Sequence, residues 1–123
     1  MKITPVLLVE AIEPCLPFWV DRMGFQKTAE VPHGDRLGFV ILVYGDVELM
    51  FQTLASARDD APQLVPAGQS ASAVFIVVDD FADAARRLAG YPIALPERTT
   101  FYGMREIGVI EPGGHSVVFA APV

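Results

Sequence analysis

Three polar side chains fall where the sequence predicts the interior face of a β-strand. Glu48 and Gln52 belong to an expected strand over 47–53, and Glu106 to one over 104–110. A carboxylate on an interior face must be paired, raised in pKa, or in contact with a wet pocket. Glu48 could therefore hold a ligand cation or act as a base. The alternative is a salt bridge from Glu48 to Arg36 or Arg105 that satisfies both charges.

The remaining side chains with reactive or metal-binding chemistry are few and scattered. His33 lies in an expected turn and His115 at the mouth of an expected hairpin, where we interpret both as solvated or turn-satisfying residues. No metal-binding motif of close His and carboxylate spacing occurs. The single Cys15 cannot form an internal disulfide, and we expect it to be a buried small apolar residue.

Composition limits the classes of partner. The chain has 123 residues, 52% of them hydrophobic and 20% charged, which fits one ordinary globular domain. The net charge of −6 and the scattering of nine basic residues oppose nucleic-acid binding. No apolar run is long enough to span a bilayer, and the first ten residues are typical of a strand rather than a leader. We therefore expect a cytoplasmic protein without nucleic-acid or membrane partners.

The elements that must position these residues occur twice. Residues 4–12 and 73–81 are both apolar, β-branched stretches that end in acidic residues and lead into an amphipathic stretch. The first copy predicts a β-α-β-β-β module over 1–54. Its helix begins near Glu13 and ends at Gly24, and its strands cover 3–9, 25–31, 37–44 and 47–53.

The second copy predicts the same module over 71–123. Asp79 or Asp80 caps a helix that ends at Gly90, and strands cover 73–78, 91–96, 104–110 and 115–120. Residues 55–70 are expected to be a linker with one helical turn. The predicted fold class is α+β, with two tandem βαβββ modules in a single domain.

Three motifs carry a resemblance to a known family. They are Val-Asp-Asp at 78–80, Tyr-Gly-Met-Arg-Glu at 102–106 and Glu-Pro-Gly-Gly-His at 111–115. In this setting of duplicated modules they resemble the vicinal oxygen chelate superfamily, which holds glyoxalase I, the bleomycin- and fosfomycin-resistance proteins and the extradiol dioxygenases. The resemblance implies that each module curls its mixed sheet into a half-cup, that a pocket forms between the two, and that the protein is a homodimer.

The resemblance also implies where a divalent metal would be held. Family enzymes place ligands on the first and last strands of each module, and these positions correspond here to Thr4, Glu48, Ala73 and Val118. Only Glu48 is a good metal ligand. A register slip of one residue would not help, because it also changes the strand face. We therefore predict that the metal site is absent and that there is no other cofactor.

Apolar side chains are expected to fill the cup instead. Strand alternation places Met50 and Phe75 on the same faces as the polar groups, and aromatic residues flank the later strands. The predicted ligand contacts are Glu48, Met50, Gln52, Phe75, Phe101, Tyr102, Glu106, Trp19 and Phe39. This composition is typical of a small-molecule pocket. It favours a metal-independent protein that sequesters an aromatic or cationic compound, as in antibiotic resistance.

Two alternatives stay open at this stage. One is a glyoxalase- or dioxygenase-like enzyme whose metal is held differently, for example by Glu48 with His115 and water. The other is a structural or regulatory module without a ligand. The sequence also does not decide whether the modules pair within one chain or are exchanged between the chains of the homodimer.

Overall fold

The structure is a computed structural model that describes residues 1–68 and 71–123. The chain divides into two compact units, Met1–Ser70 and Ala71–Val123. Gln69 and Ser70, at the end of the predicted linker, lie outside the described residues. A single domain built from both units stays a prediction.

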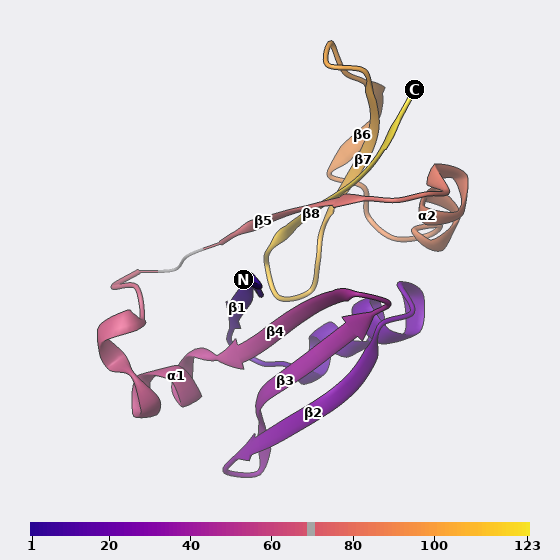
Figure 1. Cartoon of the computed structure of the whole chain (residues 1–123). Helices are drawn as coiled ribbons and strands as arrows, with labels where there is room; N and C mark the ends of the chain where they lie inside the picture. The colour runs from indigo at the N-terminus through magenta and orange to yellow at the C-terminus, as the bar shows by residue number, and fades with distance from the viewer. Residues whose placement is uncertain (69–70) are drawn as a thin grey trace. The chain divides into compact units, whose positions relative to one another are not determined.

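Unit 1 (Met1–Ser70) contains a four-stranded mixed sheet in the order β1-β4-β3-β2 (Figure 1). The strands are β1 (Val6–Val9), β2 (Gln26–His33), β3 (Arg36–Tyr44) and β4 (Val47–Thr53). β1 is parallel to β4, and the other neighbours are antiparallel. The tight turn between β3 and β4 needs a left-handed residue, which Gly45 supplies with φ +59°.

Unit 2 (Ala71–Val123) repeats this connectivity in a second four-stranded sheet, β5-β8-β7-β6. Its strands are β5 (Ala73–Val77), β6 (Leu95–Thr99), β7 (Met104–Ile110) and β8 (Ser116–Pro122). The predicted α+β class and its duplication are thus confirmed. The strand expected over 91–96 was wrong in its bounds, because Pro92 lacks the N–H that a strand ladder requires and β6 begins only at Leu95.

The first predicted helix is broken into two short pieces. A 3-10 turn covers Glu13–Cys15, and a π-helix covers Pro17–Arg22. Pro17 explains the break, since its ring clashes with the carbonyl four residues earlier and it offers no N–H. The segment still ends as predicted, with Gly24 at φ +83°.

Both α-helices begin at a side-chain cap. In α1 (Leu54–Asp60) the Thr53 hydroxyl accepts a hydrogen bond from the Ser56 N–H at 3.1 Å. In α2 (Phe81–Arg87) the Asp80 carboxylate accepts one from the Asp83 N–H at 3.0 Å, which confirms the predicted cap. A 3-10 turn over Pro62–Leu64 follows α1. The predicted linker therefore holds more helix than the single turn expected.

The core of unit 1 is built around Trp19. Its side chain is 0% exposed and meets Phe18, Phe25 and Phe51 edge-on at centroid distances of 5.2, 5.3 and 5.8 Å. Such edge-to-face pairs are a favoured aromatic geometry. The expectation that Trp19 contacts a ligand is corrected here: it packs inside the core of unit 1, on the apolar stripe of its own helical segment.

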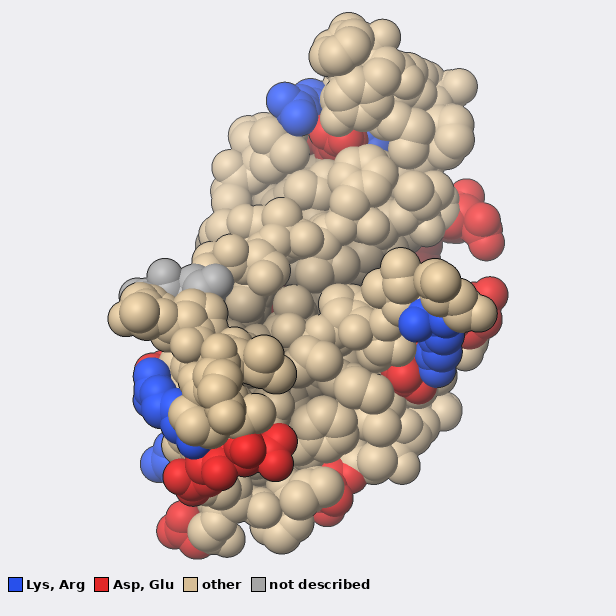
Figure 2. Space-filling view, turned by 60° about the vertical axis from the view of Figure 1, so that its left-hand side comes forward, with Lys and Arg blue, Asp and Glu red and all other residues tan. Residues whose placement is uncertain are grey.

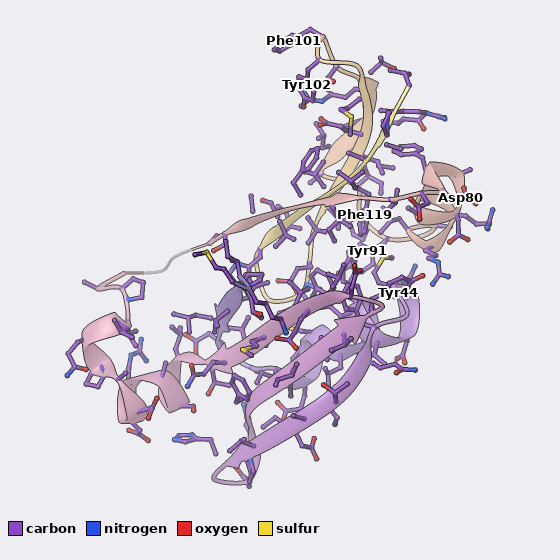
Figure 3. All side chains as sticks on the ribbon, viewed as in Figure 1. Tyr44, Asp80, Tyr91, Phe101, Tyr102 and Phe119 are labelled. Carbon is purple, nitrogen blue, oxygen red and sulfur yellow. The ribbon has the colours of Figure 1, made fainter. Side chains whose placement is uncertain are left out.

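In unit 2, α2 packs against β8. The buried side chains of this layer include Phe81, Leu88, Val117 and Phe119, the last of which is labelled in Figure 3. Arg105 lies on the same side of the sheet, with its guanidinium 4.6 Å from the centroid of the Phe81 ring and 2.9 Å from the Glu97 carboxylate. Arg105 therefore faces the helix layer.

Candidate functional site

The sheet of unit 1 has one covered face and one partly open face. Along β4, Leu49 and Phe51 are buried while Met50 and Gln52 are only half-buried, as the predicted alternation requires. Strand register places Phe39 opposite Gln52, Ile41 opposite Met50 and Val43 opposite Glu48. The open face of unit 1 is therefore defined by Val6, Leu8, Phe39, Ile41, Val43, Glu48, Met50 and Gln52.

Glu48 is the charged group of this face. Its Oε1 accepts a hydrogen bond from the Thr4 hydroxyl at 3.0 Å and lies 3.1 Å from the Lys2 ammonium. The hydrogen bond from Lys2, followed by that from Thr4, lowers the pKa of Glu48, so the carboxylate is ionised at neutral pH. The alternative of a salt bridge from Glu48 to Arg36 or Arg105 does not hold, because the ion pair of Glu48 is made by Lys2 instead.

The donor set for a family metal does not fit in either unit. Thr4 and Glu48 are hydrogen-bonded neighbours, as their mapping predicted. In unit 2, however, Ala73 lies opposite Ser116, and Val118 lies opposite Phe75. The two mapped positions of unit 2, Ala73 and Val118, are therefore not directly opposite each other on β5 and β8 but are offset by two residues.

Neither the two mapped positions of unit 2 nor the residues opposite them supply a good metal ligand. Alanine, valine and phenylalanine have no donor atom, and a serine hydroxyl is a poor ligand. Within the described ranges 1–68 and 71–123, no group of three or more His, Cys, Asp and Glu side chains is placed to hold a metal ion. The residues present thus disagree with the metal chemistry that the fold suggests.

A recess opens beside the strands of unit 1. Its volume is about 290 Å³, and its walls come from β1, β4, α1 and the segment that follows α1. The lining residues are Val6, Leu8, Gln52, Ala57, Asp60, Ala61, Leu64 and Val65. The sequence interpretation missed this wall because it treated residues 55–70 as a linker. The signal was present in the helical spacing of the apolar residues at 57, 61, 64 and 65.

α1 is fastened to the sheet at several points. Besides the Thr53 cap, His33 Nε2 lies 2.7 Å from the Asp59 carboxylate. His33 was expected to be solvated or to satisfy its turn, and it instead contacts this helix. Close approach is possible because Gly38 has no side chain: a Cβ there would lie 2.6 Å from the His33 Cβ and 3.2 Å from the Ser56 Cβ.

Glu106 in unit 2 is 1% exposed and uses both carboxylate oxygens. Arg98 donates to Oε1 from Nε at 3.1 Å and Nη2 at 3.0 Å, and the Tyr102 hydroxyl donates to Oε2 at 2.5 Å. The Tyr102 hydrogen bond is the main cause of the lowered pKa of Glu106, and the same bond raises the pKa of Tyr102. Figure 3 shows Tyr102 with Phe101 at the tip of the β6–β7 hairpin.

The remaining predicted ligand contacts, Phe101 and Phe75, are exposed, whereas His115, the residue named in the metal-site alternative, is buried. Phe101 is 100% exposed, with its ring perpendicular to that of Tyr102 at 5.1 Å. Phe75 is half exposed on β5. His115 was expected to be solvated or to satisfy its turn, but it is buried, and its Nδ1 accepts a hydrogen bond at 2.9 Å from the N–H of Ser72, 43 residues earlier and just before β5. Glu106 and Tyr102 thus share one cluster in unit 2, while Glu48, Met50, Gln52 and Phe39 share the open face of unit 1.

The Tyr102→Phe variant is expected to raise the pKa of Glu106 toward its ordinary value. The carboxylate loses the hydrogen bond that contributes most to its lowered pKa. A carboxylate whose pKa is lowered by folding stabilises the folded state at pH values above its unfolded-state pKa. This stabilisation is lost as the pH falls through the folded-state pKa. The stability difference between variant and wild type should therefore shrink on acidification. Carboxyl NMR titration and denaturation at several pH values measure both effects, with Tyr44→Phe as control; an unmoved pKa contradicts the assignment.

Surface charge and helix length are the features that bear on binding to nucleic acid and to a membrane. Among the described residues on the face drawn in Figure 2, Lys and Arg side chains stand in small separate groups beside Asp and Glu. None of the helices in the described part of the chain has the length and apolarity that a bilayer crossing requires.

Comparison with solved structures identifies the fold. No protein-family model and no curated protein sequence matches the chain. Similar solved structures include a glyoxalase/bleomycin resistance protein/dioxygenase from Nocardioides, with 16% identity, TM-score 0.78, and coverage of 100% of this chain and 84% of that one. A bleomycin-binding protein from Streptomyces verticillus, complexed with copper(II)-bleomycin, has 26% identity, TM-score 0.67 and coverage of 100% and 97%. The lactoylglutathione lyase from Agrobacterium tumefaciens has 17% identity, TM-score 0.78 and coverage of 98% and 92%. The chain therefore has the fold of the glyoxalase/bleomycin-resistance/dioxygenase group, the vicinal oxygen chelate superfamily.

Proposed function

We propose that the protein binds an aromatic or cationic small molecule on the open face of unit 1 without using a metal ion. One observation carries the proposal: a partly exposed apolar strand face holds a single carboxylate, Glu48, whose pKa is lowered by its neighbours. Apolar walls with a few orienting polar groups are the usual composition of a ligand site. The S. verticillus protein complexed with copper(II)-bleomycin shows that this fold can hold a small molecule.

A ligand cation has a direct route to Glu48. The partner of the carboxylate is Lys2, whose side chain is 68% exposed. An exposed lysine–carboxylate pair is weak, because water screens it and ordering the lysine side chain costs entropy. An ammonium on a ligand that also buries apolar surface can therefore displace Lys2 from Glu48.

The metal-dependent alternative has less support. It would use Glu48 with His115, yet the His115 imidazole is buried and its Nδ1 already accepts a hydrogen bond from Ser72. The family's ligand positions in unit 2, Ala73 and Val118, also lack donor atoms. We propose in addition that the protein sequesters its ligand, that it is cytoplasmic and that it is a homodimer, as predicted from the sequence.

Elemental analysis of protein purified without chelator, followed by a thermal-shift screen, tests the proposal. We expect substoichiometric divalent metal and stabilisation by aromatic cations that added EDTA does not change, since a ligand that binds only the folded state raises its stability. Neutral aromatic compounds and aldehyde–thiol adducts complete the panel. Stoichiometric metal with binding lost in EDTA would favour the enzyme, and no stabilisation by any compound would leave only the structural module.

A further inference from the structure

The recess beside α1 has the size of a small aromatic group. Its volume is about 290 Å³, close to the lower end of roughly 300–1,000 Å³ for ligand pockets. A cavity of about 150 Å³ accommodates one benzene ring. A volume near twice that value suits two fused rings.

The walls are almost wholly aliphatic. Six of the eight lining residues carry apolar side chains, and the two polar ones are Gln52 and Asp60. The Gln52 amide already donates to the Ser56 hydroxyl at 3.3 Å. Asp60 is therefore the group of the recess that can select a ligand by charge.

The carboxylate of Asp60 has no hydrogen-bond or ion-pair partner in the described part of the chain, whereas its neighbour Asp59 is paired with His33. Arg58 lies two residues before Asp60 on α1, and residues two apart on a helix do not face each other. A ligand ammonium would meet an unpaired anion, and such charge-assisted contacts are the stronger hydrogen bonds. An anionic ligand would meet repulsion from both Asp59 and Asp60.

The wall that carries Asp60 is fixed before any ligand arrives. The Thr53 cap and the His33–Asp59 contact hold the two ends of α1, and Gly38 allows the helix to approach the sheet closely. A preformed wall lowers the ordering cost of binding. The recess therefore exists as a site rather than as a gap that the ligand must open.

We propose that the recess binds a one- or two-ring aromatic amine, with the rings against the aliphatic walls and the protonated amine paired with Asp60. This inference rests on the proposed function and deepens it, because it names the ligand class and a second carboxylate. The recess shares Val6, Leu8 and Gln52 with the open face, but its carboxylate lies away from Glu48: residues 48 and 52 are four apart on β4, roughly 13 Å along an extended strand.

NMR titration of the full-length protein with three probes of one shape tests the inference: 1-naphthylmethylamine, 1-naphthylmethanol and 1-naphthylacetate. We expect the amine to bind about tenfold more tightly than the alcohol, the loss typical of one charge-assisted contact, and the acetate to bind most weakly. The methyl signals of Ala57, Ala61 and Leu64 should shift on binding of the amine.

Two variants and one control complete the test. Asp60→Asn should reduce amine affinity to that of the alcohol and leave the alcohol unchanged. Ala61→Phe should fill the recess and weaken all three probes, with the thermal midpoint showing that the variant is folded. Asp46→Asn, which removes the same charge from the exposed β3–β4 turn, should change nothing.

The outcomes separate this inference from the proposed function. Equal affinities for the amine and the alcohol, or an unaltered amine affinity in Asp60→Asn, would overturn the inference. Binding that shifts the signals of Ile41 and Met50 but none from the recess would also overturn it, while the proposed function would stand. Binding of no compound in either experiment would overturn both.

Discussion

Replacing Trp19 with alanine is expected to lower the free energy of unfolding by about 3–5 kcal/mol, the usual range for a large aromatic side chain removed from a packed core. Trp19 is 0% exposed and contacts three other aromatic rings in unit 1. The total stability of a domain is about 5–15 kcal/mol. The variant should therefore unfold at a much lower denaturant concentration.

Circular dichroism during urea denaturation measures this loss, because Trp19 is the only tryptophan and its fluorescence disappears with the substitution. Phe101→Ala is the matched control: it truncates an aromatic side chain that is 100% exposed, and its stability should stay within about 0.5 kcal/mol of wild type. A loss below about 1 kcal/mol for Trp19→Ala would place Trp19 outside the core and restore it as a candidate ligand contact.

Replacing Glu48 with glutamine is expected to weaken the binding of an aromatic cation about tenfold, since one charge-assisted contact is lost. The affinity for a neutral aromatic compound of the same shape should not change. The thermal midpoint should also stay close to that of wild type, because the Lys2 pair is exposed and its loss costs little. Binding of each compound by calorimetry measures the difference.

Two further substitutions control the Glu48 result. Lys2→Met removes the ammonium that competes for the Glu48 carboxylate, so the aromatic cation should bind more tightly. Asp46→Asn, in the β3–β4 turn, changes the net charge by the same amount as Glu48→Gln and should leave affinity unaltered. If Glu48→Gln and Asp46→Asn behave alike, long-range charge rather than contact explains any effect.

The duplicated strand pattern predicted most of the fold. Strand alternation over 47–53 placed Glu48, Met50 and Gln52 on one face, and the structure confirms this placement. Period-two patterns are strong where one face is buried and the other is open. The cap and the glycine at the two ends of α2 could also be predicted, because the conformation that each residue favours depends on only a few neighbouring residues.

The sequence did not predict the break in the first helix, the register of β5 against β8, or the recess. A proline in the second turn changed the first helix into shorter pieces, although Trp19 and Met23 are still buried. The register of β5 against β8 could not be predicted, because nothing local in either strand specifies it. The recess was missed because its wall is a helix within a segment rich in turn-forming residues, where helical spacing is easily overlooked.

The central claim, that the open face of unit 1 binds an organic cation without a metal, is tested most directly by calorimetric titration of EDTA-treated protein with an aromatic cation. We predict saturable binding to wild type that is unchanged when a divalent metal is restored, and affinity about tenfold weaker in Glu48→Gln. Binding that appears only after metal is restored, or that is equal in wild type and Glu48→Gln, would contradict the claim.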